Sequence, residues 1–170
     1  MDQLVTFAAM AEIFGALAIL AGGLFAIVQF SEFRKRRRYQ VAAELCRQFA
    51  DPDFARAIVL IRQLPDGISL EALKDLDSEY EQSAQVLAMT FETMGLLVYE
   101  NLASFRIIQQ LTGGLLLDVW RKLSVWVATV RIESGNPRFA EWVQWLAERL
   151  AEEEEEMVPA YQAFADWGRR

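Results

Sequence analysis

The chain has 170 residues, about one ordinary domain, and its 17 Lys and Arg against 24 Asp and Glu give a net charge of −7. It contains no histidine, which excludes catalysis, metal binding and pH switching that depend on imidazole. Its single cysteine, Cys46, excludes an intramolecular disulfide and any zinc site built from several thiolates.

The N-terminal region has the composition of a membrane span. No formal charge occurs from Ile13 to Phe30, and the apolar stretch that starts at Leu4 is interrupted only by Glu12. A helix over these 27 residues would be about 40 Å long, more than the roughly 30 Å hydrocarbon core of a bilayer requires. A buried core helix rarely lacks a polar face over this length, and a cleavable signal peptide carries its positive charges before the apolar run. We predict one transmembrane helix within residues 1–33.

Five consecutive basic residues follow the predicted span. They are Arg34, Lys35, Arg36, Arg37 and Arg38. Positive charges mark the cytoplasmic side of a span, so we expect a bacterial inner-membrane protein with its N-terminus outside and its C-terminal domain in the cytoplasm. Residues 34–50 are predicted to form a basic juxtamembrane helix in contact with anionic headgroups. Beyond this run, 12 positive residues face 21 negative ones, which argues against nucleic acid as a partner.

Small residues recur at steps of three or four along the predicted span. This small-residue stripe consists of Ala8, Ala11, Gly15, Ala18, Gly22 and Ala26. Such a stripe lets helix backbones approach closely in lipid, although Ala and Gly are also common in spans for no special reason. Glu12 lies beside the stripe and is either an intramembrane functional carboxylate or a group that reaches the outer interface.

Helical signals dominate the rest of the chain, which we predict to be one α-helical domain over residues 51–170 with an acidic C-terminal extension. Tyr39–Ala50 continues the membrane helix. Asp51 and Pro52 have the chemistry of a helix start, and this helix extends to Leu64. A strand over residues 57–61 is the competing interpretation, which the helix-start chemistry disfavours.

Further helices follow in chain order. Ser69 begins a short helix, and the spacing of Ser78 and Glu81 is that of a capping box at the head of a helix that reaches Tyr99. Ser104 caps a short helix that ends near Gly113–Gly114. A separate helix follows from Leu116, although its β-branched residues 125–132 also suit a strand.

The C-terminal part repeats the same stop and start signals. Gly135 ends one helix, Asn136 caps the next, and Pro137 opens it. Tyr161, Phe164 and Trp167 form a terminal apolar face. The run Glu152–Glu156 is either a solvated helix face or, much less favourably, a site for a divalent cation.

Catalytic patterns are absent from the sequence. It has no phosphate-binding loop, no dinucleotide fingerprint and no nucleophile elbow, and without histidine a Ser or Cys nucleophile lacks its usual base. We therefore predict no catalytic residues, no cofactor and no metal, and a protein that is not an enzyme. The tryptophans, including Trp126 and Trp142, are more consistent with a core than with a protein interface.

Several segments together resemble a known family. They are F-E-x-M-G-L-L-V at residues 91–98, W-R-K-L at 120–123 and R-I-E-S-G-N-P at 131–137, after a stretch ending F-A-D-P at 49–52. Over residues 30–150 the chain resembles an uncharacterised bacterial family of membrane-anchored proteins, classed as a domain of unknown function. The resemblance implies an all-α architecture and does not supply an activity. It also singles out four positions: Glu92, Gly95, Trp120 and Arg131. From the residues alone, packing and a buried Glu–Arg pair account for these four.

Taken together, the sequence predicts an all-α protein with one N-terminal transmembrane helix that continues into a cytoplasmic multi-helix domain. We expect a self-associating scaffold or interaction protein, whose partners are an anionic bilayer, other copies of itself and a cytoplasmic protein. The alternative is a homo-oligomeric pore or membrane-permeabilising effector formed by the N-terminal helices, with Glu12 facing the lumen.

Overall fold

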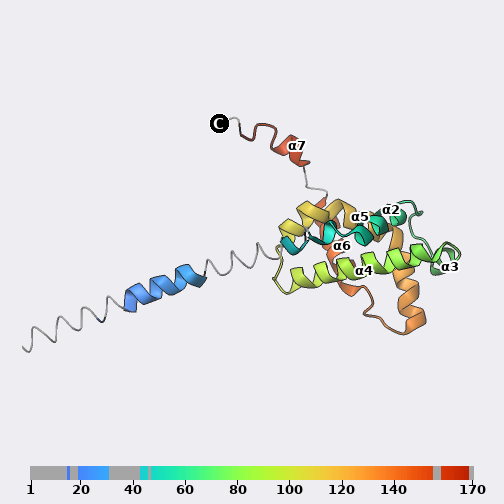
Figure 1. Cartoon of the computed structure of the whole chain (residues 1–170), viewed down its shortest axis with the longest axis horizontal. Helices are drawn as coiled ribbons and strands as arrows, with labels where there is room; N and C mark the ends of the chain where they lie inside the picture. Colours follow the sequence, from blue (N-terminus) through green and yellow to red (C-terminus); the bar gives the residue numbers. More distant parts are fainter. Residues whose placement is uncertain (1–14, 16–18, 31–42, 46, 155–157, 169–170) are drawn as a thin grey trace, which may run out of the picture. The chain divides into compact units, whose positions relative to one another are not determined.

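A computed structural model describes residues 15, 19–30, 43–45, 47–154 and 158–168. Its contacts divide the chain into two compact units, Met1–Val41 and Ala42–Arg170. In the first unit, residues 15 and 19–30 are helical (Figure 1). Within the described ranges, no helix combines the length and the apolar character that crossing a membrane requires. Much of the predicted span over residues 1–33 and of the basic helix over residues 34–50 lies outside these ranges.

The second unit is built from helices. They are α2 (Pro52–Arg62), α3 (Leu70–Lys74), α4 (Ser78–Tyr99), α5 (Phe105–Ser134), α6 (Glu141–Glu154) and α7 (Ala160–Ala163). The described residues contain no strand, and residues 57–61 and 125–132, where a strand was the competing interpretation, are helical. The predicted all-α fold is therefore confirmed.

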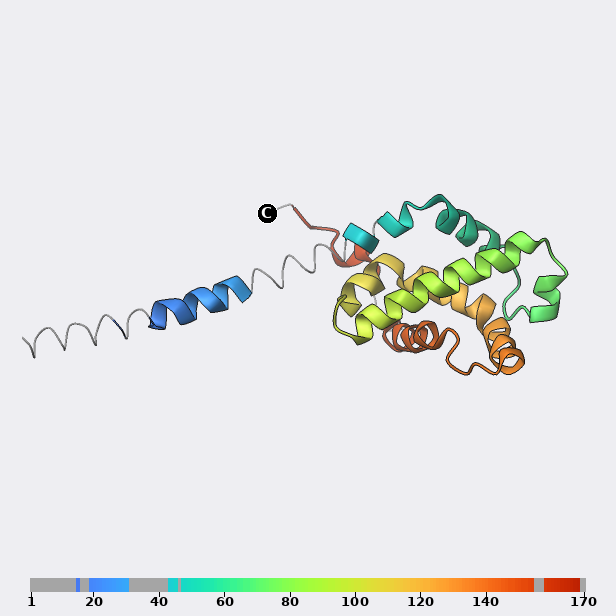
Figure 2. The ribbon, with the colours of Figure 1, turned by 60° about the horizontal axis from the view of Figure 1, so that its bottom comes forward.

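Helix α4 is the centre of this unit. It packs against α2 on one side and α6 on another, and it also contacts α5 and α3 (Figures 1 and 2). Phe91 of α4 is completely buried, and its ring meets the ring of Phe54 edge-on at 5.9 Å. Phe49 extends this aromatic contact at 5.4 Å from Phe54, and Leu45 is only 2% exposed. Leu45 and Phe49 thus contribute to the core of the unit.

The predicted caps are confirmed at α2 and α3, whereas α4 runs from Ser78 to Tyr99 as predicted but has a different cap. The Asp51 carboxylate accepts hydrogen bonds from the amides of Asp53 (2.8 Å) and Phe54 (3.2 Å), and Ser69 Oγ accepts one from the amide of Ala72 (3.1 Å). At α4 the cap is Asp77, which accepts from the amide of Glu79 at 3.0 Å. The predicted capping box at Ser78 is wrong by one residue, because the preceding aspartate is an equally good cap.

The predicted helix end at Gly113–Gly114 is wrong, because α5 is one continuous helix of 30 residues. Gly113 is buried, and a Cβ atom there would lie 3.6 Å from Leu150 Cδ2. Packing against α6 therefore overrides the cost of a helical glycine, which is about 1 kcal/mol. The end of α5 is as predicted, at Gly135 in the left-handed conformation with φ of 64°.

The predicted start of the last helix at Pro137 is also wrong, since α6 begins at Glu141. The Asn136 side chain accepts a hydrogen bond from the amide of Arg138 at 3.1 Å and so caps a turn. Ala140 then adopts a left-handed φ of 54°, which interrupts any helix that started earlier. The first turn of α6 consequently needs another source of hydrogen-bond acceptors.

Candidate functional site

The start of α6 is capped by a side chain from α4. Glu92 Oε2 accepts hydrogen bonds from the amides of Trp142 (2.9 Å) and Val143 (3.0 Å). Amides in the first turn of a helix have no acceptor within that helix, so an outside carboxylate satisfies them and suits the positive end of the helix dipole. Glu92 therefore joins α4 to α6 across 50 residues of sequence.

A guanidinium from α5 holds the turn that precedes α6. Arg131 donates from Nε to the Phe139 carbonyl at 2.8 Å and from Nη2 to the Ala140 carbonyl at 3.1 Å. Its Nη1 donates to Gln144 Oε1 at 2.7 Å. Glu92 and Arg131 do not pair with each other, in contrast to the pair suggested by the sequence. Each instead binds backbone atoms of the same segment, residues 139–143.

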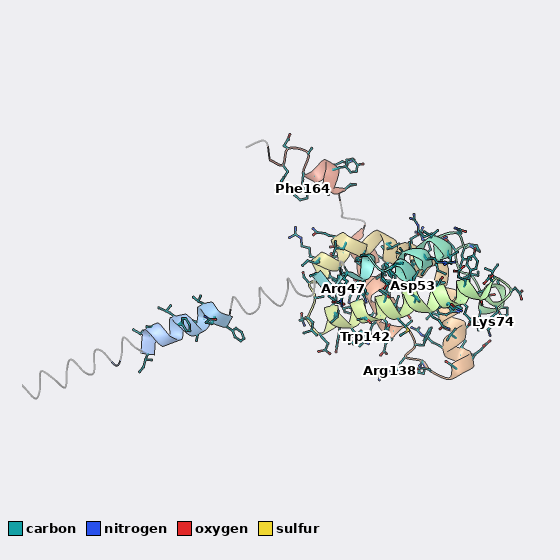
Figure 3. All side chains as sticks on the ribbon, viewed as in Figure 1. Arg47, Asp53, Lys74, Arg138, Trp142 and Phe164 are labelled. Carbon is teal, nitrogen blue, oxygen red and sulfur yellow. The ribbon has the colours of Figure 1, made fainter. Side chains whose placement is uncertain are left out.

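Gly95 brings the backbones of α4 and α6 into contact. A Cβ atom at Gly95 would lie 2.3 Å from the carbonyl oxygen of Trp142, closer than any real contact, so only glycine fits there. Trp142 lies at this junction (Figure 3). Of the four positions that the resemblance singled out, Glu92, Gly95 and Arg131 therefore meet at the start of α6. Trp120 is half-buried on α5 and takes no part in these hydrogen bonds.

Burial raises the pKa of the Glu92 carboxyl above its ordinary value. The hydrogen bonds from the amides of Val143 and Trp142 act in the opposite direction, and so does the positive charge of Arg131, while the negative charge of Glu141 adds to the rise. The net direction is upward, so the carboxylate is held in place by hydrogen bonds while its charge stays incompletely compensated.

The chemistry of this region is that of a structural junction. Glu92 lines a cavity of about 180 Å³ with Met89, Arg138 and Phe139, and Arg138 is paired with Glu141 at 2.9 Å. Across the part of the chain that the structure describes, no three His, Cys, Asp or Glu side chains are grouped so that they could hold a metal ion. The interactions seen here fasten helices to one another.

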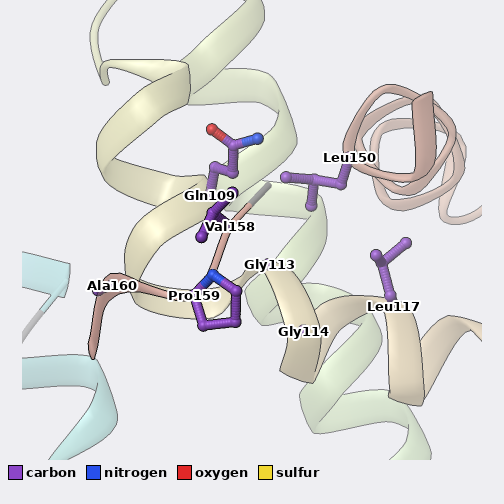
Figure 4. Close-up of a pocket in the computed structure, with 8 residues that line it drawn as sticks. All are labelled: Gln109, Gly113, Gly114, Leu117, Leu150, Val158, Pro159 and Ala160. Carbon is purple, nitrogen blue, oxygen red and sulfur yellow. The ribbon is translucent and has the colours of Figure 1, made fainter. Parts of the chain in front are cut away.

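A second candidate region is an apolar pocket of about 220 Å³ beside the C-terminal segment (Figure 4). Its walls come from α5, α6 and the segment after α6: Gly113, Gly114, Leu117, Leu150, Val158 and Pro159. Gln109 lies at its edge and donates to Glu153 Oε2 at 2.9 Å. The sequence signal for this pocket is the glycine pair inside a helical pattern, which also suits a helix end, as predicted above, but marks a packing site in the structure.

The tryptophans divide between core and surface. Trp126 is buried in the core, at 1% exposed, whereas Trp142 and Trp145 are half-buried on α6. The Tyr99 ring lies 4.5 Å from that of Trp142, and the Arg149 guanidinium lies 4.6 Å above the Trp145 ring. The prediction of a tryptophan core therefore holds for Trp126 and fails for this α4–α6 surface cluster.

The remaining predicted site residues belong to the first unit. Gly15, Gly22 and Ala26 of the small-residue stripe lie on exposed helix, and no atom lies within 4 Å of a Cβ built at Gly15 or Gly22. The other predicted residues fall outside the described ranges. They are Ala8, Ala11, Glu12, Ala18, Arg34, Lys35, Arg36, Arg37 and Arg38.

The fold is an all-α domain. At its α6 junction, side chains from α4 and α5 form hydrogen bonds to backbone groups. Residues 16–150 match the family described as Domain of unknown function (DUF4760), and the chain belongs to this family. No curated protein and no solved structure matches the chain. The expected relation to an uncharacterised domain family is thus confirmed.

Proposed function

We propose that this protein is a membrane-anchored, self-associating helical scaffold that displays its α-helical domain on the cytoplasmic side of a bacterial inner membrane. The observation that supports this proposal is the surface of residues 19–30. Their large apolar side chains are mostly exposed, for example Ile19 (77%), Phe25 (65%) and Ile27 (68%). A helix that is apolar all round requires an apolar environment, which a bilayer provides.

The basic run that follows supports the orientation. Each Lys or Arg close to an anionic membrane surface contributes on the order of 1 kcal/mol, so Arg34–Arg38 would hold the chain against the headgroups of the inner leaflet. The acidic domain beyond it would be repelled by the same surface and left free to meet a cytoplasmic protein.

The small-residue stripe supports association between copies. Gly15 and Gly22 have open space where a Cβ would lie, so a second helix can approach the backbone there. In lipid, packing of this kind is a main source of helix–helix affinity.

Membrane fractionation of the full chain tests the anchor. We expect Leu20→Arg with Leu24→Arg to move the protein out of the membrane pellet, since each arginine at the centre of a span costs roughly 2.5–3.5 kcal/mol. Ile132→Arg is the matched control, because Ile132 is 82% exposed on α5 and belongs to the helical domain. A double variant that stays in the pellet contradicts the proposed anchor.

The mass of the detergent-solubilised particle tests self-association. Gly22→Ile should lower the mass, while Gly23→Ile should leave it unchanged. Both glycines have open space around them, but only Gly22 is on the stripe. Equal masses for both variants and the unchanged chain contradict association through the stripe. The pore alternative is tested by cation conductance in planar bilayers. If the full chain conducts cations and Glu12→Gln abolishes the conductance, the pore hypothesis replaces the scaffold hypothesis.

A further inference from the structure

The segment after α6 carries an exposed aromatic face. Tyr161 is 76% exposed, Phe164 58% and Trp167 84%. Helical turns fix this segment, with the Phe164 amide bound to the Ala160 carbonyl and the Trp167 amide bound to the Phe164 carbonyl, each at 3.0 Å. Large apolar side chains gathered on a surface mark a site of interaction. We therefore expect this C-terminal tail, residues 158–168, to bind a partner.

The same unit contains a pocket whose size and apolar walls suit an aromatic side chain. The pocket of about 220 Å³ in Figure 4 is walled by glycine, leucine, valine and proline. An apolar cavity of about 150 Å³ is enough to bind benzene, so this pocket can receive one aromatic ring. Gly114 keeps one side open, because no atom lies within 4 Å of a Cβ built there.

The tail of the same copy is poorly placed to fill this pocket. Val158, Pro159 and Ala160 already form one of its walls. The turns that begin at Pro159 then leave the aromatic rings in solvent, so filling the pocket from within would require these turns to unwind. A tail from a second copy needs no such change.

Charge favours the tail as the occupant. The acidic run Glu152–Glu156 follows closely after the pocket residue Leu150, and the basic pair Arg169–Arg170 follows closely after Trp167. The arginines that follow Trp167 in the sequence are opposite in charge to the glutamates that follow Leu150, so the tail of one copy and the pocket segment of another are complementary in charge. Exposed pairs of this kind contribute modestly and weaken with salt, so they select the orientation more than they supply affinity.

We propose that two copies exchange their C-terminal tails, with the Trp167 ring of each copy entering the pocket between α5 and α6 of the other. Because every copy offers one tail and one pocket, the exchange closes into a two-fold dimer. The nine residues from Pro159 to Trp167 reach at most about 28 Å over their eight Cα–Cα steps, which limits the distance between the two pockets. The inference rests on the proposed function in one respect, that copies of the chain meet.

A photo-crosslinker in place of Trp167 tests the exchange. The full chain with benzoylphenylalanine at this position is prepared as an equal mixture of ¹⁴N and ¹⁵N protein in detergent. We expect crosslinked peptides that join residue 167 to the α5 segment around Gly114 and that carry both isotopes. Crosslinks within single copies only, to other surfaces, or to detergent and added lipid overturn the proposal.

Two variants in this crosslinking background make the result specific. Gly114→Leu fills the pocket mouth on a helix that gains propensity, so the mixed-isotope crosslink should fall about tenfold or more. Gln110→Leu is the matched control, since Gln110 is exposed on the same helix outside the pocket, and the crosslink should persist. A crosslink that survives Gly114→Leu overturns the assignment to this pocket.

The two proposals fail separately. If the crosslink is absent while the particle mass still depends on Gly22, tail exchange is wrong and the membrane-anchored scaffold stands. If the crosslink is present while the arginine variants of residues 20 and 24 stay in the membrane pellet, the proposed anchor is wrong and the tail exchange stands.

Discussion

At the scale of single residues, three residues determine where α6 starts. Glu92 satisfies two amides of its first turn, Arg131 holds two carbonyls of the preceding turn, and Gly95 leaves room for the Trp142 backbone. These residues come from different helices and act on the same five-residue segment. Because each of these residues acts on different atoms of the segment, substituting one of them measures its contribution separately.

Gly95→Ala should destabilise the domain. Its Cβ would overlap the Trp142 carbonyl oxygen, which is backbone and cannot rotate away, so we expect a loss of about 1–3 kcal/mol in the free energy of unfolding. Gly114→Ala is the control, since its Cβ meets open space and should stabilise α5 by up to about 1 kcal/mol. Urea denaturation measures both, and a neutral Gly95→Ala would contradict the close approach of α4 and α6.

Glu92 should make stability depend on pH. Burial raises its pKa in the folded protein, so the folded state binds the proton more tightly than the unfolded chain does. The stability gained from this proton is complete below the ordinary glutamate pKa and is lost as the pH rises through the raised value. Glu92→Gln keeps an acceptor for both amides and does not titrate.

We therefore expect the stability of the wild type relative to Glu92→Gln to fall as the pH rises from the ordinary glutamate pKa through the raised pKa of Glu92. The groups facing Glu92, Arg131 and Glu141, are present in both proteins, so their own contributions largely cancel in the comparison. Urea denaturation across this range gives the difference. A difference that is flat, or that rises with pH, would contradict the raised pKa.

At the scale of helices, α5 determines the position of α6. Its 30 residues make it about 45 Å long, and it contacts α2, α3, α4 and α6. Gly113 lets Leu150 of α6 approach near one end, and Arg131 fastens the turn into α6 near the other. The position of α6 is thus determined at two places along one helix.

Arg131→Lys should loosen the start of α6. The guanidinium reaches the Phe139 carbonyl, the Ala140 carbonyl and the Gln144 amide oxygen from three separate nitrogens in one plane, whereas an ammonium donates from a single atom and loses part of this geometry. We therefore expect a loss of about 1.5–3 kcal/mol. Hydrogen exchange should also quicken at residues 141–145. Arg121→Lys is the matched control, because Arg121 is 62% exposed and makes one pair with Asp118 on the same helix. Equal losses of stability for the two substitutions would contradict the role of Arg131 in holding the turn before α6.

Local chemistry predicted most helices and missed what depends on packing. Asp51 and Ser69 cap helices whose starts the local sequence predicts, because an N-cap binds amides within three residues of itself. The helix through Gly113 was missed since its cause, contact with Leu150, is distant in sequence. The cap of α6 cannot be predicted for the same reason. Glu92 lies 50 residues before its partner, and no short sequence pattern predicts a hydrogen bond over that separation.

At the scale of the whole chain, the helical unit begins before its first capped helix. The compact unit starts at Ala42, and residues before Asp51 supply the buried Leu45 and the ring of Phe49 that meets Phe54. This short stretch therefore serves the core of the helical unit in addition to connecting the two units.

A protein that starts at Ala42 should unfold at the same denaturant concentration as the full chain. A protein that starts at Asp51 should be less stable by about 1.5–3 kcal/mol, the value of burying one leucine, although it keeps the cap of α2. Guanidinium denaturation followed by tryptophan fluorescence measures both. Equal midpoints for the two truncated proteins would show that residues 43–49 are outside the core.

The junction at α6 has a consequence for how the loop before it can be redesigned. Glu92 and Arg131 bind mainly amides and carbonyls, groups that every residue except proline provides alike. The turn therefore takes its shape mostly from backbone groups, while the Phe139 ring is held by its edge-on contact with the buried Trp126 at 5.5 Å and Ala140 is restricted by its positive φ. The exposed Pro137 and Arg138 are accordingly the positions of this loop where an engineer can change side chains while the start of α6 stays in place.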